Sequence, residues 1–249
     1  MGSARRAHPG RDLGAGIMTN TASGVTVEPG TIVVFAEIAS PWAHLAVHRL
    51  HETRRRLGLY ERVLFDIRAC PLELINGIPT PKLIIDSEVP VAAVMEPDAG
   101  WQLWQGPAHE WPVTTLPAME AVEAAKDQGL RAGESLDRAL RRSFFSESRT
   151  ISMRHVILDV AASCPEVDAD ALRNTLGQGS ARAAVERHLS VAQSDAVQGS
   201  PHLFLPDGTS AFNPGITWHW QGQPGRGFPV VDSDDPAVYE RLLRQAASA

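Results

Sequence analysis

Cysteine is scarce in this chain of 249 residues. Its two cysteines, Cys70 and Cys164, lie far apart, and neither belongs to a Cys-X-X-Cys pair. The sequence therefore offers no disulfide framework and none of the cysteine spacings of a zinc site. We expect no metal ion in the protein.

Long apolar runs and an excess of basic residues are also missing. No stretch of about 20 apolar residues occurs, so no membrane-spanning helix is expected. Acidic residues outnumber basic residues by 29 to 23, so nucleic acid and anionic membrane surfaces are not expected partners. The first 28 residues contain Arg5-Arg6 but no apolar segment of a secretory signal, which predicts a cytoplasmic protein. Met18 is an alternative start to Met1.

Composition divides the chain into a tail and a globular part. Residues 1–29 are rich in glycine, alanine, serine, threonine and arginine, and are predicted to be disordered. Residues 30–249 are long enough to bury a substantial core. Apolar residues make up 43% of the chain and charged residues 21%, which is typical of a soluble globular domain.

The most informative stretch is Thr31–Leu50. Its apolar, β-branched residues 32–35 predict a buried strand. Ser40 followed by Pro41 indicates the start of a helix, because serine can cap the first turn and proline has no N–H to leave unpaired. We expect the helix to continue to about Leu57, just before a glycine. Backbone N–H groups at such a helix N-terminus favour an anion, including a thiolate.

Two landmarks in the sequence resemble a known family. Ser40-Pro41-Trp42-Ala43 is similar to the redox motif of thioredoxin-fold proteins of the DsbA-like group, with serine and alanine in place of the cysteines. This group includes kappa-class glutathione transferases and 2-hydroxychromene-2-carboxylate isomerases, which have serine first. Residues 198–208 resemble the family's cis-proline strand and hairpin. The resemblance implies an α/β thioredoxin fold over 30–249 with a helical insertion at about 86–192.

The resemblance also implies roles for individual residues. Ser40 would donate a hydrogen bond to the sulfur of a bound thiol and stabilise its thiolate. Pro201 would be cis, and would place the backbone of Ser200 against the thiol cofactor. Arg68, at the end of the second strand, would pair with a carboxylate of the cofactor. The cofactor-binding residues implied are Pro41, Trp42, Arg68, Ser200 and Pro201.

Three histidines form a stripe on the helix that follows Ser40. His44, His48 and His51 fall on the face opposite the apolar one, and a solvated face is the simplest interpretation. A metal site is the alternative, but no carboxylate accompanies them at ligand spacing. His44 lies one turn after Ser40, so it is either a catalytic acid–base residue of the site or a histidine that faces solvent.

Hydrophobic periodicity and turn residues predict the remaining elements. They are a strand at 62–69, a loop at 70–81, helices at 116–129, 135–145, 152–162 and 180–192, a strand at 209–213, an aromatic and glycine-rich loop at 215–231 and a closing helix at 236–247. The loop at 215–231 would form a pocket rim or an oligomer contact. Trp101, Trp104 and Trp111 would either line an apolar pocket or fill the seam between the insertion and the core.

Two functions of different class follow from this pattern. Ser40 and Ala43 exclude dithiol–disulfide exchange at the motif, because that reaction needs an attacking thiolate and a resolving cysteine. The resemblance implies a transferase or isomerase that uses glutathione or mycothiol, acts on a small-molecule electrophile and forms a homodimer. The alternative is a redox-inert protein whose aromatic pocket binds an apolar small molecule or a peptide. A third interpretation makes Cys70 a one-cysteine redox centre.

Overall fold

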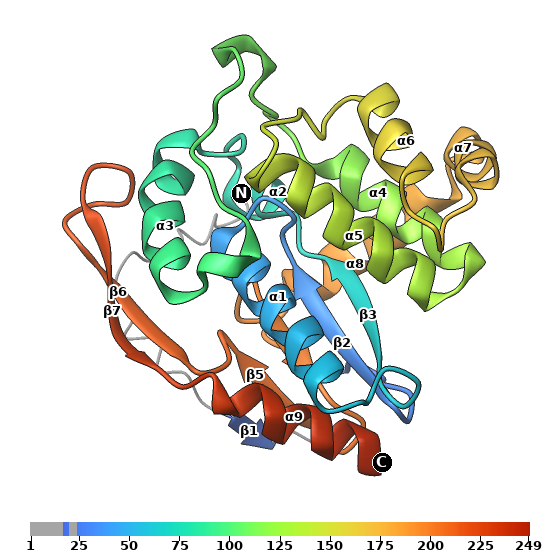
Figure 1. The fold of residues 1–249 in the computed structure, drawn as a ribbon, viewed down its shortest axis with the longest axis vertical. Helices are drawn as coiled ribbons and strands as arrows, with labels where there is room; N and C mark the ends of the chain where they lie inside the picture. Colours follow the sequence, from blue (N-terminus) through green and yellow to red (C-terminus); the bar gives the residue numbers. More distant parts are fainter. Residues whose placement is uncertain (1–16, 20–23) are drawn as a thin grey trace, which may run out of the picture.

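A mixed five-stranded sheet forms the centre of the computed structural model, which describes residues 17–19 and 24–249 (Figure 1). The strand order is β1-β5-β4-β2-β3; β2 and β3 are parallel and the other neighbours are antiparallel. The strands are β1 (Ile17–Thr19), β2 (Thr31–Ala36), β3 (Leu64–Ala69), β4 (His202–Phe204) and β5 (Thr209–Phe212). This mixed α/β arrangement confirms the predicted fold class, and the predicted strands at 32–35, 62–69 and 209–213 are present.

Helices cover both faces of the sheet, and β2 is therefore buried on both sides. Ile32 and Val34 pack against α1 (Pro41–Arg56) and α9 (Ala237–Ser248), whereas Val33 and Phe35 belong to a second apolar cluster on the opposite face. Every residue of β2 is buried. This explains why its sequence is a continuous apolar run and not an alternating one.

The segment between β3 and β4 is helical. It contains α2 (Leu72–Asn76), α3 (Lys82–Met95), η1 (Pro97–Ala99), η2 (Ala108–Glu110), α4 (Leu116–Ala125), η3 (Lys126–Gln128), α5 (Leu130–Phe145), α6 (Arg154–Ala162), α7 (Ala169–Gln178) and α8 (Ser180–Ala192). The four helices expected here are present: α8 has the expected bounds, whereas α4, α5 and α6 have shifted ends. The expectations miss α2, α3 and α7; Pro90 inside α3 is a residue that normally argues against a helix. Within the described residues, no helix is long and apolar enough to cross a membrane.

The predicted loop at 215–231 is instead a β-hairpin, so that prediction is wrong. β6 (Ile216–Gln221) pairs with β7 (Phe228–Asp234) in a separate two-stranded sheet, which lies alongside α3 in Figure 1. Gly222 and Gly225 in its turn have positive φ angles. Of the glycines and prolines that suggested a loop, those at 222–227 lie in the turn, whereas Gly215 precedes β6 and Pro229 lies within β7.

Part of the N-terminal segment is a strand. Within the region expected to be disordered, β1 pairs antiparallel with the free edge of β5, with Ile17 opposite Ala211 and Thr19 opposite Thr209. Residues 1–16 and 20–23 lie outside the described part of the chain. The choice between Met1 and Met18 as the start stays a prediction.

The buried stripe of α1 also differs from the expectation. His44 and His51 are only 6% and 7% exposed, because η1 and α5 cover this side of the helix. The prediction of a solvated histidine face is therefore wrong. Helix periodicity alone could not reveal it, because the covering elements come from the insertion.

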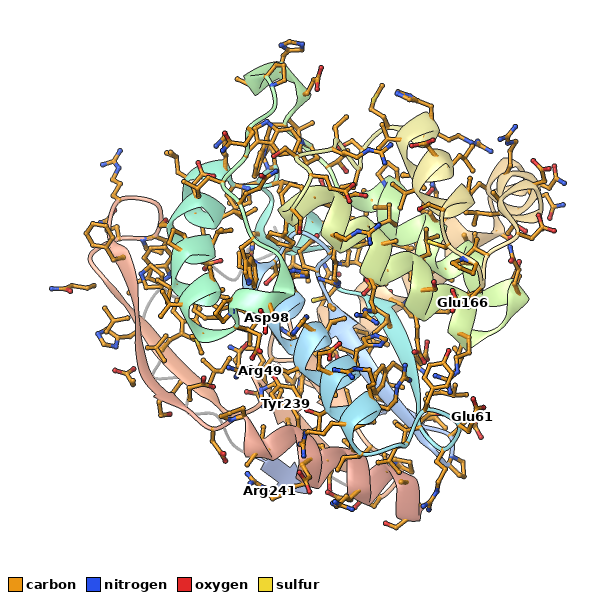
Figure 2. All side chains as sticks on the ribbon, in the orientation of Figure 1. Arg49, Glu61, Asp98, Glu166, Tyr239 and Arg241 are labelled. Atoms are coloured by element: carbon orange, nitrogen blue, oxygen red, sulfur yellow. The ribbon has the colours of Figure 1, made fainter. Side chains whose placement is uncertain are left out.

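One buried arginine fastens the hairpin to the core. Arg49 on α1 donates through Nη1 and Nη2 to the two carboxylate oxygens of Asp234 on β7, at 2.6 and 2.8 Å, and through Nε to Glu96 at 3.0 Å. Its guanidinium lies 6.0 Å from the centre of the Tyr239 ring on α9, and Figure 2 labels both residues. Arg49 therefore joins α1, the end of α3, β7 and α9.

Arg49→Met should lower the free energy of unfolding by about 2–3 kcal/mol, because it leaves two partly buried carboxylates without their cation. Urea denaturation measures this change. The matched control is Arg241→Met, which removes an exposed pair with Asp235 and should have a much smaller effect, because solvent screens exposed ion pairs. Equal effects of the two substitutions would contradict the role assigned to Arg49.

Candidate active site

Ser40 caps the first turn of α1. Its Oγ accepts a hydrogen bond from the Ala43 N–H at 3.3 Å, and its carbonyl accepts from the His44 N–H at 2.9 Å. Because Pro41 has no N–H, Trp42 carries the remaining first-turn amide, and that amide has no hydrogen-bond partner among the described residues. The end of α1 thus presents the Ser40 O–H and the Trp42 N–H as two donors for an anion.

The second landmark lies against the first. The Ser200–Pro201 peptide bond is cis, as the family resemblance implied. β4 is antiparallel to β2 with His202 opposite Phe35, so the residues before His202 lie opposite the residues after Phe35. The backbone N–H of Glu37 accordingly donates to Ser200 Oγ at 2.7 Å. Ser200 and Pro201 therefore lie beside the loop at residues 37–40 that leads into α1.

Glu37 organises the loop between β2 and α1. It is 6% exposed, and its carboxylate accepts from Thr115 Oγ1 at 2.7 Å and from the amides of Ala39 and Leu72 at 3.1 Å each. Burial raises the pKa of this carboxyl, and the hydrogen bonds oppose the rise. Sequence reasoning missed Glu37, although a single acid inside an otherwise apolar run was a signal for it.

A buried arginine also holds this loop, through hydrogen bonds to its backbone carbonyl groups. Arg141 on α5 is 1% exposed and pairs with Asp137 at 2.8 Å. Its Nη1 donates to the carbonyl oxygens of Glu37 and Ile38 at 3.0 and 3.2 Å. The backbone that leads into Ser40 is therefore fixed from both sides, which keeps the donors of α1 in place before a ligand arrives.

The indole ring of Trp42 is covered by other side chains and is not open to a ligand. It is 4% exposed and its ring stacks on Trp218 of β6 at a centroid separation of 4.8 Å. Beside it lies Glu88 of α3, which is 7% exposed and has no salt bridge within the described residues. Burial raises the pKa of Glu88 to about 8, which the indole of Trp42 partly offsets. Sequence reasoning missed this buried acid within the apolar α3.

His44 is neutral and enclosed. Its Nε2 lies 3.0 Å from the carbonyl oxygen of Ala99, and its ring stacks on Phe145 and meets Trp101 edge-on. Burial is the main cause that lowers its pKa to about 3. His44 therefore lies one turn from Ser40 as expected, but it is neither solvent-facing nor charged at neutral pH.

Arg68 and Cys70 lie at the end of β3, and neither makes a hydrogen bond or ion pair with Ser40 among the described residues. Arg68 pairs with Asp66 at 2.7 Å and lies 6.0 Å from the Phe35 ring, on the face of the sheet opposite α1. Cys70 is 1% exposed, and burial raises the pKa of its thiol to about 12. A thiol of this kind is a poor nucleophile, which weighs against a one-cysteine redox centre.

The three insertion tryptophans fill a seam. Trp104 and Trp111 meet edge-on at 5.3 Å and both pack against Phe144, whereas Trp101 packs against Phe145. These contacts leave their rings against α5. The seam interpretation is therefore favoured over an apolar pocket. In the part of the chain that the structure describes, no group of three histidine, cysteine, aspartate or glutamate side chains is placed to hold a metal.

Comparison with known proteins fits this geometry. The model of the DSBA-like thioredoxin domain matches residues 31–219. The chain belongs to this family. No curated protein sequence matches the chain.

Solved structures share the fold at low sequence identity. The cytosolic disulfide reductase DsbM from Pseudomonas aeruginosa, with GSH, is 16% identical at a TM-score of 0.57, over 73% of this chain and 89% of that one. A probable DsbA oxidoreductase from Streptomyces coelicolor is 18% identical at 0.57, over 88% and 90%. A putative protein disulfide isomerase from Nitrosomonas europaea is 10% identical at 0.59, over 87% and 97%.

Glu88→Gln should stabilise the protein increasingly as the pH rises. The pKa of Glu88 is about 8 in the folded protein against an ordinary value of 4.5, so the folded state holds a proton that the unfolded chain releases. Wild-type stability therefore falls between about pH 4.5 and 8 through this group. The advantage of the variant should grow by roughly 2–4 kcal/mol from pH 5 to 8.5.

Urea denaturation at the two pH values tests this expectation. Glu61→Gln is the control, because Glu61 is an exposed carboxyl on the surface (Figure 2). The same pH-dependent gain in both variants, or none in Glu88→Gln, would show that Glu88 is not buried as described.

Proposed function

We propose that this protein is a thiol-dependent transferase or isomerase that binds a low-molecular-weight thiol at the N-terminus of α1. The observation that carries the proposal is the placement of the capped N-terminus of α1 beside the cis Ser200–Pro201 bond, joined by the Glu37-to-Ser200 hydrogen bond. Backbone donors and the helix dipole stabilise negative charge at this point. A thiol held there would ionise more readily than in water.

Ser40 has the central role in this proposal. Its oxygen already accepts from Ala43, which leaves its proton free to donate to a sulfur anion. The free N–H of Trp42 supplies a second donor. The bound thiolate would add to the electrophilic carbon of a conjugated C=C bond, and the electron pair of that bond would move onto the conjugated group. Protonation of the adduct would complete a transfer, whereas re-formation of the double bond with loss of the thiolate would complete an isomerisation.

Ser200 would bind the peptide part of the thiol through its backbone. Its side chain is used by the Glu37 N–H, whereas its own N–H and C=O have no hydrogen-bond partner among the described residues. Such groups at the end of a strand can pair with an extended peptide. Pro201 holds this segment beside Pro41 and the start of α1.

The other predicted site residues keep narrower roles. His44 is neutral, so we assign it the positioning of the first turn of α1 and not proton transfer. Arg68 remains a predicted ligand for a carboxylate, and this role requires its guanidinium to leave Asp66. Trp42 would contribute its backbone N–H, because its ring is stacked on Trp218.

Glutathione is the thiol that the relatives favour. DsbM, which shares the fold, has been solved with GSH. Mycothiol has no comparable support and stays a prediction, as do the cytoplasmic location and the homodimer.

Calorimetric titration with glutathione at pH 8 tests the role of Ser40. Ser40→Gly should weaken binding roughly 10- to 100-fold, because a hydrogen bond to a charged group is lost. Glycine is a tolerated cap that costs the helix only a few tenths of a kcal/mol. Ser40→Thr keeps the hydroxyl and should retain most of the affinity.

Asp168→Ala is the matched control for stability. Asp168 caps α7 by accepting from the amides of Asp170 and Ala171, and it lies outside the candidate site. Its loss should destabilise the protein by about 1 kcal/mol without changing the affinity for glutathione. Binding that is indifferent to Ser40, or binding of apolar ligands alone, would favour the redox-inert binding protein instead.

A further inference from the structure

A polar cleft of about 490 Å³ lies between α1 and α5, apart from the Ser200–Pro201 strand end. It contains the histidine stripe that the sequence singled out: His44, His48 and His51 all line it. Arginines of α5 line the facing wall. The proposed thiol site uses the N-terminus of α1 and leaves this side of the helix without a function.

Three residues that line the cleft carry a buried nitrogen with no hydrogen-bond partner among the described residues. These atoms are His51 Nε2, Arg131 Nη1 and Arg141 Nη2. His51 and Arg141 are 7% and 1% exposed. Buried polar atoms without partners are rare in folded proteins, so the residues that line the cleft contain donors that the described residues leave unpaired.

All three atoms are hydrogen-bond donors. The arginine nitrogens can only donate. Arg54 Nη2 lies 3.2 Å from His51 Nδ1, which makes Nδ1 the acceptor and places the proton of the neutral ring on Nε2. A ligand that completes this cleft therefore has to supply acceptors.

Arg138 provides the available charge. Its nearest carboxylate is Glu52 at 3.9 Å, and its guanidinium donates no hydrogen bond to a described residue. Glu52 is held instead by Arg55 at 2.6 Å. By contrast, Arg54 and Arg142 are paired with Glu134 and Glu147. Arg138, and Arg131 with its carboxylate partner Glu134 at 3.7 Å, are therefore the lining cations that a ligand can reach without breaking a short ion pair.

The pKa values of the three histidines indicate that the guanidinium of Arg138 lies near them. Burial is the main cause that lowers the pKa of His44, His48 and His51, and the charge of Arg138 contributes in all three cases. The guanidinium is therefore close to the whole stripe. An anion bound to Arg138 would have neutral imidazoles beside it.

Four acidic residues also line the cleft, namely Glu52, Asp98, Glu134 and Glu166. Asp98 and Glu166 appear on either side of α1 in Figure 2, in η1 and in the loop after α6 respectively. Glu134 is neutralised by Arg54 and Arg131. The lining as a whole contains five arginines and four acidic residues.

We propose that the cleft between α1 and α5 is a binding site for a small organic anion with a carboxylate or phosphate group, held by Arg138. Such a group accepts two hydrogen bonds from one guanidinium, which suits a planar, bidentate contact. The site is separate from the thiol site. It is connected to it through Arg141, which lines the cleft and also holds the loop that leads to Ser40.

Calorimetric titration of the full chain with succinate, inorganic phosphate and neutral succinamide tests the proposal. Wild-type protein should bind succinate or phosphate saturably, and the arm that binds identifies the preferred group. Succinamide should not bind. Arg138→Gln should weaken binding at least about tenfold, because it removes a charge-assisted contact, and Arg138→Lys should retain part of it.

Two variants make the result specific. Arg182→Gln removes an exposed arginine of α8 outside the cleft, paired with Glu120, and should bind as wild type does. Ser40→Gly should also bind succinate normally, which separates this site from the thiol site. Unchanged affinity in Arg138→Gln, equal loss in Arg182→Gln, or no binding of either anion by the wild type would overturn the proposal.

Discussion

The hydrogen bond from the Glu37 backbone N–H to Ser200 Oγ, 2.7 Å long, joins the two segments that carry the candidate site. These segments are more than 160 residues apart in the chain, and the helical insertion separates them. The Glu37 carboxylate accepts from Ala39, Leu72 and Thr115, which ties the same point to α2 and to the start of α4. A buried carboxylate needs such a set of donors to offset its desolvation. The position of Ser40 therefore depends on the core and the insertion together.

The proposed action of a cysteine-free site on a bound thiol depends on this constraint. The fold keeps the features that stabilise an anion, namely a capped helix N-terminus and a strand end with unpaired backbone groups. It lacks the attacking and resolving thiols of disulfide exchange, so a sulfur atom has to come from a bound molecule. Neither Cys70 nor Cys164 substitutes for them, because both are buried. The cleft behind α1 adds a basic surface that shares Arg141 with the site.

The sequence predicted the parts of this structure that depend on local chemistry. Ser40-Pro41 marked the start of α1, and the residues around Pro201 marked the cis bond and β5. It could not predict which faces the insertion would cover, so the enclosure of His44 and His51 was missed. Arg68 was predicted to bind a cofactor, but it pairs with Asp66, two residues away on the same face of β3. Glu88 and Arg141 stand out only through their tertiary contacts, whereas Glu37 had a signal in the sequence as a single acid in an apolar run. The β6–β7 hairpin was obscured by the glycines of its turn.

The most direct test of this account is the pKa of the glutathione thiol when it is bound, followed by ultraviolet absorbance of the thiolate over a pH titration. A free thiol ionises at about pH 8.5. The account predicts a clearly lower pKa in the complex with wild-type protein, and a return towards the free value with Ser40→Gly. A bound thiol with the pKa of the free one, or a lowered pKa that persists in Ser40→Gly, would contradict the claim that Ser40 and the N-terminus of α1 stabilise a thiolate.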